Sequence, residues 1–275
     1  MVKKGESYLL AGFHLWRQSK VSTLAAAVAY YSVLSLVPLF AVLLRIGGIV
    51  LGDTQAQMQL GIQLHAFTGG TSTVLVDQVL QTIAGKGSLT TDIVTVSVFL
   101  IGSTELFYKL QLALNTIWGI PPVGVQYALR HRLLSLVTIM LLGGLLLVSF
   151  AAGTLFAVAS QWIGTVAPVL ASVLFWQRVE ILISFFTVTM LFSISYRVLP
   201  ARTVSWSASW WGALIAGTLF IIGRLGIGWY VATRDFTFYG AAGSFLAFLL
   251  WLYFAIQLYL LGAVISAVYD GHRAS

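Results

Sequence analysis

The sequence predicts an all-α fold, a polytopic bundle of membrane-spanning helices. Of the 275 residues, 59% are hydrophobic and 8% are charged, and the mean hydropathy is +0.94. A single soluble core of this size cannot bury so much apolar surface. The apolar residues also form long unbroken runs, whereas membrane barrels show short alternating segments. We therefore expect residues 1–275 to form one integral membrane domain.

Six apolar runs are long enough to cross a membrane as helices. They lie near residues 24–44, 93–118, 133–157, 179–199, 208–231 and 241–268. The second run begins with the apolar stretch DIVTVSVFLIG and continues as an amphipathic stretch that stops at Pro121 and Pro122. We expect this helix to cross the membrane and then emerge or run along its surface.

Lysine and arginine residues predict the orientation of these crossings. Cations gather before the first run, after the second and the fourth, and in the tail: Lys3, Lys4, Arg17, Lys20, Lys109, Arg130, Arg132, Arg197, Arg202 and Arg273. We expect this side, with both termini, to be cytoplasmic. This topology accounts for most of the net charge of +7, so no nucleic-acid partner is expected. The first twenty residues lack an apolar core followed by a small-residue cleavage site, and we expect them to be retained.

The segment 52–92 is the longest piece expected outside the membrane, on the side opposite the cations. Its two amphipathic stretches, joined by TGGTST, predict a short helical hairpin. Such an outer cap packs on the bundle, lies on the membrane surface, closes the outer end of a cavity or docks a periplasmic partner.

The composition argues against catalysis. The chain has no cysteine, which excludes disulfides and cysteine-based chemistry. Its eight acids and four histidines are scattered, without metal-ligand spacing, and no glycine-rich phosphate loop precedes a lysine. We therefore expect no enzyme activity, no catalytic residue, no metal and no cofactor.

Several polar groups nevertheless lie inside the apolar runs. In AAAVAYYSVLSLVPLF, Tyr31, Ser35 and Pro38 share one helical face. This face either makes a tight contact with another helix or lines a hydrated, substrate-facing cavity. Arg224 lies well inside the fifth run and must face protein or water, with Glu180 or Asp235 as candidate partners.

Small residues recur along the fifth run and predict close helix contacts. Ser205, Ser209, Ala213 and Gly217 form a ridge at every fourth position, which serves either the bundle or a homodimer. Glycines 223, 226 and 228 flank Arg224 and permit either a bend or a close backbone approach at the level of the charge, the kind of place where a transporter interrupts a helix. In the second run, Glu105 and Lys109 are spaced for an ion pair.

Four stretches together resemble the YihY/BrkB family of bacterial inner-membrane proteins over about residues 15–270. These are AAAVAYYSVLSLVPLF, LQLALNTIWGI, YRVLP and YGAAGSFLAFLLWLYFAIQLYLLGAVISAVYD. The matching positions are Tyr30, Tyr31, Ser35, Pro38, Leu114, Asn115, Trp118, Gly119, Tyr196, Arg197, Pro200, Tyr239, Gly240, Trp251, Tyr253, Gly262 and Ala263. Val264 stands where the family usually has an acidic residue, so a role that requires this carboxylate is not expected here.

The resemblance implies a multi-pass protein of the bacterial inner membrane, with three readings of its function. The first is a transporter or lipid-handling protein for an anionic phospholipid or a related envelope component. The second is a non-transporting scaffold whose periplasmic cap recruits an envelope partner. The third, an old family label of ribonuclease, conflicts with the scattered acids and histidines.

For the first reading, a cavity between helices would accommodate an anionic headgroup, since arginine binds phosphate through two parallel hydrogen bonds. The candidate cavity residues are Tyr30, Tyr31, Ser35, Pro38, Asn115, Tyr196, Arg197, Arg224 and Tyr239. The expected partners are membrane lipids, a second copy of the chain and a periplasmic envelope protein.

Overall fold

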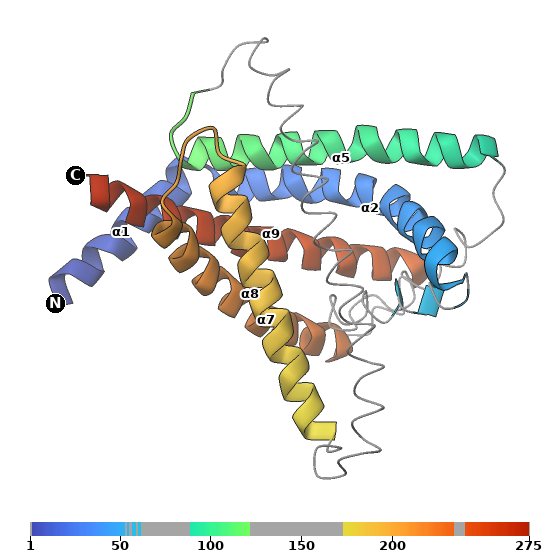
Figure 1. The fold of residues 1–275 in the computed structure, drawn as a ribbon. Helices are drawn as coiled ribbons and strands as arrows, with labels where there is room; N and C mark the ends of the chain where they lie inside the picture. The colour runs from blue at the N-terminus through green and yellow to red at the C-terminus, as the bar shows by residue number, and fades with distance from the viewer. Residues whose placement is uncertain are drawn as a thin grey trace.

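The computed structural model describes residues 2–52, 89–121, 173–233 and 240–274, with isolated positions between 54 and 61. Within these ranges the chain is helical and contains no strand, which confirms the all-α prediction (Figure 1). The helices are α1 (Val2–Gln18), α2 (Val21–Leu51), α5 (Leu89–Ile117), α7 (Val173–Val198), α8 (Trp206–Thr233) and α9 (Gly240–Ala274).

Three of these helices contain stretches long and apolar enough to cross a membrane. The stretches are Ile181–Val198, Trp206–Arg224 and Phe245–Gly271, and α2 adds a shorter apolar stretch at Val21–Ser35. They coincide with the fourth, fifth, sixth and first expected runs. The third run, 133–157, and nearly all of the cap at 52–92 lie outside the described residues, so six crossings and the cap stay predictions.

The described helices converge at one end of the bundle and diverge toward the other (Figure 1). The start of α2, the ends of α5, α7 and α9 and the start of α8 meet at this converging end, where both chain termini also lie. Helix α9 is central, because it contacts α1, α2, α5, α7 and α8. The segments expected on the cation-rich side thus lie together, while the identity of that side stays a prediction.

Small buried side chains fill the core at the converging end. Ala25, Ala113, Ala208 and Ala263 are fully buried between α2, α5, α8 and α9, together with larger residues such as Leu260. Short side chains let helix backbones approach closely, which stabilises helix pairs in an apolar solvent through van der Waals contact. A second cluster, farther along the bundle, contains Phe220, Phe248 and Trp251.

Helix α8 touches α9 and α7 through glycines. A Cβ atom on Gly212 would lie 2.4 Å from the carbonyl oxygen of Gly262, and one on Gly217 would lie 2.5 Å from Oγ1 of Thr189. Gly217 belongs to the small-residue ridge, and Ser209 and Ala213 of that ridge are fully buried, so the ridge serves contacts inside this chain. Helix α8 continues from Trp206 to Thr233 without interruption, so the helix break expected beside Arg224 is not present.

Local sequence signals explain where α5 ends. Gly119 has a positive φ of 66°, the N–H of Ile120 bonds to the carbonyl of Asn115, and the N–H of Gly119 bonds to the carbonyl of Thr116. This is the Schellman arrangement, in which glycine tolerates the left-handed residue that closes a helix. Helix α5 is one continuous helix up to that point.

The Gly212 contact predicts a specific sensitivity to one methyl group. Gly212→Ala should lower stability by roughly 1–3 kcal/mol, because the new Cβ overlaps the α9 backbone, which cannot move aside cheaply. Gly226→Ala on the same helix is the control, since its Cβ meets nothing within 4 Å. Thermal unfolding of both variants in mild detergent measures the difference. Equal midpoints would show that α8 and α9 are not packed this closely.

Candidate functional site

A group of polar side chains holds the connection between α7 and α8 at the converging end; we call it the bundle-end cluster. Helix α7 stops beside Pro200, since the residue before a proline disfavours helical geometry. Two α5 side chains satisfy the freed backbone groups: Asn115 Oδ1 accepts from the Ala201 N–H at 2.8 Å, and Gln111 Nε2 donates to the Leu199 carbonyl at 2.9 Å. The connection is therefore fastened to α5.

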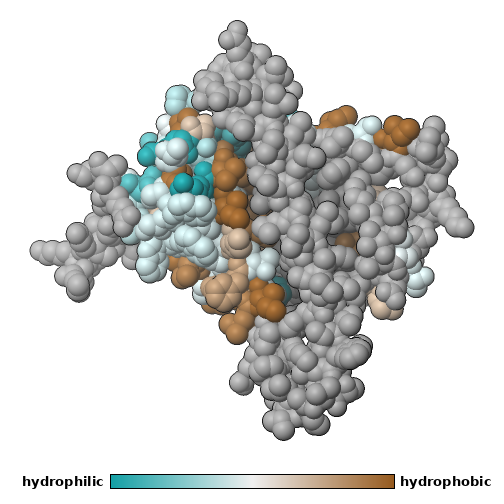
Figure 2. Space-filling model, in the orientation of Figure 1, coloured by the Kyte–Doolittle hydropathy of each residue, from teal (hydrophilic) through white to brown (hydrophobic). Residues whose placement is uncertain are grey.

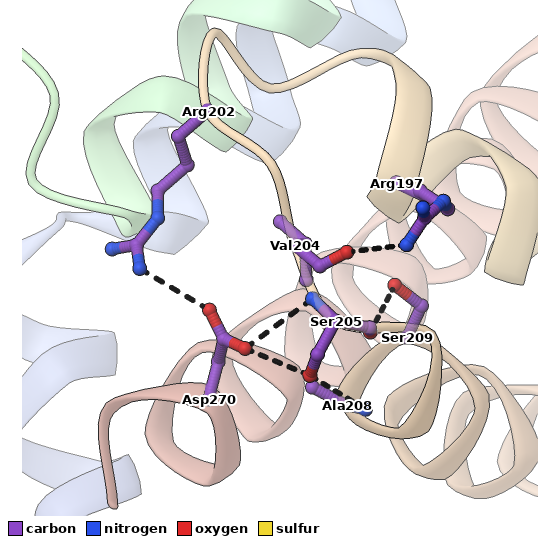
Figure 3. Close-up of polar contacts among 7 residues, drawn as sticks. All are labelled: Arg197, Arg202, Val204, Ser205, Ala208, Ser209 and Asp270. Atoms are coloured by element: carbon purple, nitrogen blue, oxygen red, sulfur yellow. Dashed lines mark hydrogen bonds and ion pairs between the residues drawn. The ribbon is translucent and has the colours of Figure 1, made fainter. Parts of the chain in front are cut away.

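Asp270, near the end of α9, fastens the same connection from the other side (Figure 3). Its Oδ1 accepts from the hydroxyl of Ser205 at 2.9 Å and from the Ser205 N–H at 3.3 Å, and its Oδ2 lies 3.3 Å from Nη2 of Arg202. The Ser205 oxygen in turn accepts from the Ala208 N–H, as an N-cap does. The carboxylate thus lies at the N-terminus of α8, where negative charge is stabilised.

Arg197 bridges the two ends of the connection. Its Nη1 donates to the Val204 carbonyl at 2.7 Å, and its guanidinium lies 4.4 Å from the centre of the Trp206 ring. A guanidinium has five N–H donors, so this bond leaves further donors for other acceptors. Arg197 is partly buried and anchored at the converging end (Figure 3).

Two buried tyrosines tie α7 to α9 beneath this connection. The Tyr196 hydroxyl donates to the carbonyl of Tyr259, and the Tyr259 hydroxyl lies 2.8 Å from Oγ of Ser195. Tyr196 is fully buried, and the two ring centres are 5.0 Å apart. Each hydroxyl therefore has a partner in an apolar environment, where an unpaired one would be costly.

A second polar group lies along the contact between α2 and α5. The Glu105–Lys109 ion pair is confirmed at 3.4 Å, and Lys109 Nζ lies 5.2 Å from the centre of the Tyr31 ring. Tyr30 is exposed and meets Tyr31 edge to face at 5.3 Å. Ser35 is buried farther along α2.

The Ser35 hydroxyl donates back to the carbonyl of Ser32 at 3.0 Å, which satisfies it within its own helix. A Cβ on Gly102 of α5 would lie 3.5 Å from the Ser35 Cα, so the two helices are close here. The side of α2 that carries Ser35 therefore makes a tight contact with another helix, α5, which was one of the two predicted alternatives.

The structure distributes the candidate cavity residues over three places. Asn115, Tyr196 and Arg197 lie at the bundle-end cluster, whereas Tyr30, Tyr31 and Ser35 lie along α2. Arg224 is 18 residues beyond Trp206 in α8, about 27 Å along the helix axis at the usual rise. The side chains of Pro38 and Glu180, and all of Tyr239 and Asp235, lie outside the described residues.

Sequence reasoning did not select Asp270 or Gln111 as site residues. Ser205, immediately before the first residue of α8, carries an N-cap signal that could have marked the helix start. Asp270 has no such local signal, because its partners are 65 and 68 residues away along the chain.

The fold and these ties define a class of protein. Apolar helices long enough to span a membrane, with exposed apolar side chains along them and hydrophilic ones gathered over the converging end, make a multi-pass membrane protein (Figure 2). The chain belongs to the Virulence factor BrkB family, whose model matches residues 13–275.

Its relatives are bacterial membrane proteins. A UPF0761 membrane protein of Aggregatibacter aphrophilus is 25% identical over 258 residues, covering 92% of this chain and 88% of the relative. One from Histophilus somni is 24% identical over 274 residues, covering 94% and 88%. One from Nitrosospira multiformis is 28% identical over 277 residues, covering 97% of this chain but 61% of the longer relative. No solved structure matches.

The bundle-end cluster predicts unequal effects of the two members of its ion pair. Asp270→Ala should cost roughly 1–3 kcal/mol of stability, because it leaves the donors of Ser205 without their acceptor. Arg202→Ala should cost at most about 1 kcal/mol, because that side chain is half exposed and Asp270 keeps its bonds to Ser205. Thermal unfolding in detergent compares the two. A larger loss for Arg202→Ala would mean that the ion pair, and not the helix cap, holds the connection.

The close contact between α2 and α5 predicts that stability is sensitive to the size of the side chain at position 35. Ser35→Leu should destabilise the chain by about 1–3 kcal/mol, since the larger side chain must fit against Gly102. Ser35→Ala should change stability by less than about 1 kcal/mol, because the lost hydrogen bond is local to α2. The thermal unfolding midpoints of the two variants measure this difference. A stable Ser35→Leu protein would instead indicate free space beside Ser35.

Proposed function

We propose that the chain transports or otherwise handles an anionic phospholipid or a related envelope component in the bacterial inner membrane. The converging end faces the cytoplasm in this proposal. Its support is the gathering of cations there, as the positive-inside rule requires. Described cations at this end are Arg17, Lys20, Lys109, Arg197 and Arg202, with Glu105 and Asp270 as the described acids beside them.

The observation that carries the proposal is the position of Lys109. It lies eight residues before the end of α5, about 12 Å inside the bundle at the usual helical rise. Its side chain is 27% exposed and lies beside the rings of Tyr31 and Tyr108. A lysine at this distance from the helix end can extend its long side chain to a phosphate at the membrane interface. Its ammonium group also remains accessible from the side of the α2–α5 pair.

The surface around Lys109 suits the rest of a lipid. Large apolar side chains are exposed farther from the converging end: Leu34 on α2, and Val98 and Ile101 on α5. Acyl chains can lie along this surface while the headgroup meets Lys109. Charge pairing and apolar contact are sufficient for lipid handling, so no covalent bond is made or broken.

Native mass spectrometry of the purified chain tests the proposal. In mild detergent, the protein should retain an anionic phospholipid class beyond its share of the membrane. Lys109→Gln should reduce this retention roughly tenfold, the usual effect of losing one charge-assisted hydrogen bond. Glu105→Gln is the matched control, because it leaves the lysine free of its carboxylate partner and should retain as much lipid or more.

The same spectrum reports the number of chains per particle. A lipid-free spectrum, or equal retention by both variants, would contradict lipid handling at Lys109. The scaffold reading would then be preferred, with the segment 52–92 as the place to seek a periplasmic partner.

A further inference from the structure

Helix α1 has an outward face that mixes apolar and basic side chains. Leu10, Phe13, His14 and Arg17 are exposed at spacings of three, four and seven residues, which places them on one side of the helix. Leu10 is 62% exposed and Phe13 is 58% exposed. Large apolar side chains that are this exposed on one face normally contact a membrane or another protein.

The opposite face of α1 is already used by the bundle. Leu15 and Trp16 pack against the core at the converging end, Ser19 is buried, and α1 contacts α9. Helices α1 and α2 meet at an elbow where Lys20 has a left-handed φ of 48°. Helix α1 therefore departs from the axis of α2 and lies obliquely at the end of the bundle (Figure 1).

Exposed tryptophans mark the membrane interface at the same end. Trp206, Trp210 and Trp211, in the first turns of α8, are exposed, and tryptophan side chains concentrate at the headgroup level of membranes. The start of α8 and the elbow both border the converging-end core, which includes Val21 and Val204. The outward face of α1 is therefore close to the headgroup layer.

The charge of this face selects the kind of headgroup. The Arg17 guanidinium carbon lies 6.0 Å from the Phe13 ring centre, so the long side chain follows the apolar surface while its charge reaches outward. Beside it is an open surface depression of about 220 Å³ at the elbow, lined by Trp16, Arg17, Lys20, Val21, Ser22 and Thr23. The described lining residues include two cations and no acid, which complements an anionic lipid surface.

We propose that the outward face of α1 is a membrane-surface anchor that binds the anionic headgroup layer of the leaflet at the converging end. Leu10 and Phe13 enter the boundary of the acyl region, and Arg17 and Lys20 bind lipid phosphates at the elbow. This anchor is independent of lipid transport, because it requires only that α1 rest on the membrane that holds the bundle.

The absence of native cysteine allows a direct test in the full chain. Leu10→Cys carries an environment-sensitive fluorophore, and Thr203→Cys, at an exposed position in the connection between α7 and α8, carries the same label as the control. The protein is reconstituted into vesicles of phosphatidylcholine with or without a quarter of phosphatidylglycerol. Lipids with a nitroxide high on the acyl chain report burial in the membrane, and aqueous iodide reports exposure to water.

The label at residue 10 should be quenched by the nitroxide lipid, and more strongly with phosphatidylglycerol, while the label at residue 203 should respond to iodide. Arg17→Gln or Lys20→Gln should weaken the phosphatidylglycerol-dependent partitioning roughly fivefold, as expected for one basic residue at an anionic surface. High salt should have the same effect.

Three results would overturn the proposal. Iodide quenching at residue 10 equal to that at residue 203 would place α1 in water. Protection from both quenchers would show that protein, such as a second copy of the chain, covers this face. Equal nitroxide quenching with and without phosphatidylglycerol would show that apolar contact acts without the lipid charge.

Discussion

The close approach of α8 and α9 at Gly212 and Gly262 is the constraint on which the rest of the structure depends. Neither residue has a side chain, so the two backbones are in contact, and a Cβ on Gly262 would also meet the Tyr196 hydroxyl. The missing side chain thus lets Tyr196 bond to the Tyr259 carbonyl, which joins α7 to the pair. In a membrane, where lipid is as apolar as the helices, such close packing supplies much of the association energy.

Once α8 and α9 are fixed, the polar groups at the converging end can meet. Asp270 reaches Ser205 because the end of α9 lies beside the start of α8, and Asn115 reaches Ala201 because α5 ends at the same level. These bonds satisfy backbone groups of the α7–α8 connection that the helices leave free. The cluster holds Arg197 beside Trp206.

Both proposals concern the same membrane interface. Lys109 is accessible from the side of the α2–α5 pair, whereas Arg17 and Lys20 belong to the elbow between α1 and α2. Since α2 takes part in both places, lipid bound at the elbow and lipid bound at Lys109 would contact the same helix. The family relationship defines a bacterial membrane protein, and the charges and apolar surfaces of this chain support the proposal of an anionic lipid.

The sequence by itself determined the class of protein, the approximate positions of the described helices other than α1, the Glu105–Lys109 pair and the small-residue ridge of α8. Each depends on composition or on spacings within one helix, which the helical period fixes. Only the tertiary structure decided that the ridge meets α9 and α7, that Asp270 caps α8, and that Arg197 and Arg224 lie far apart. These contacts depend on how helices tilt and on their relative depth, and packing between distant segments sets both.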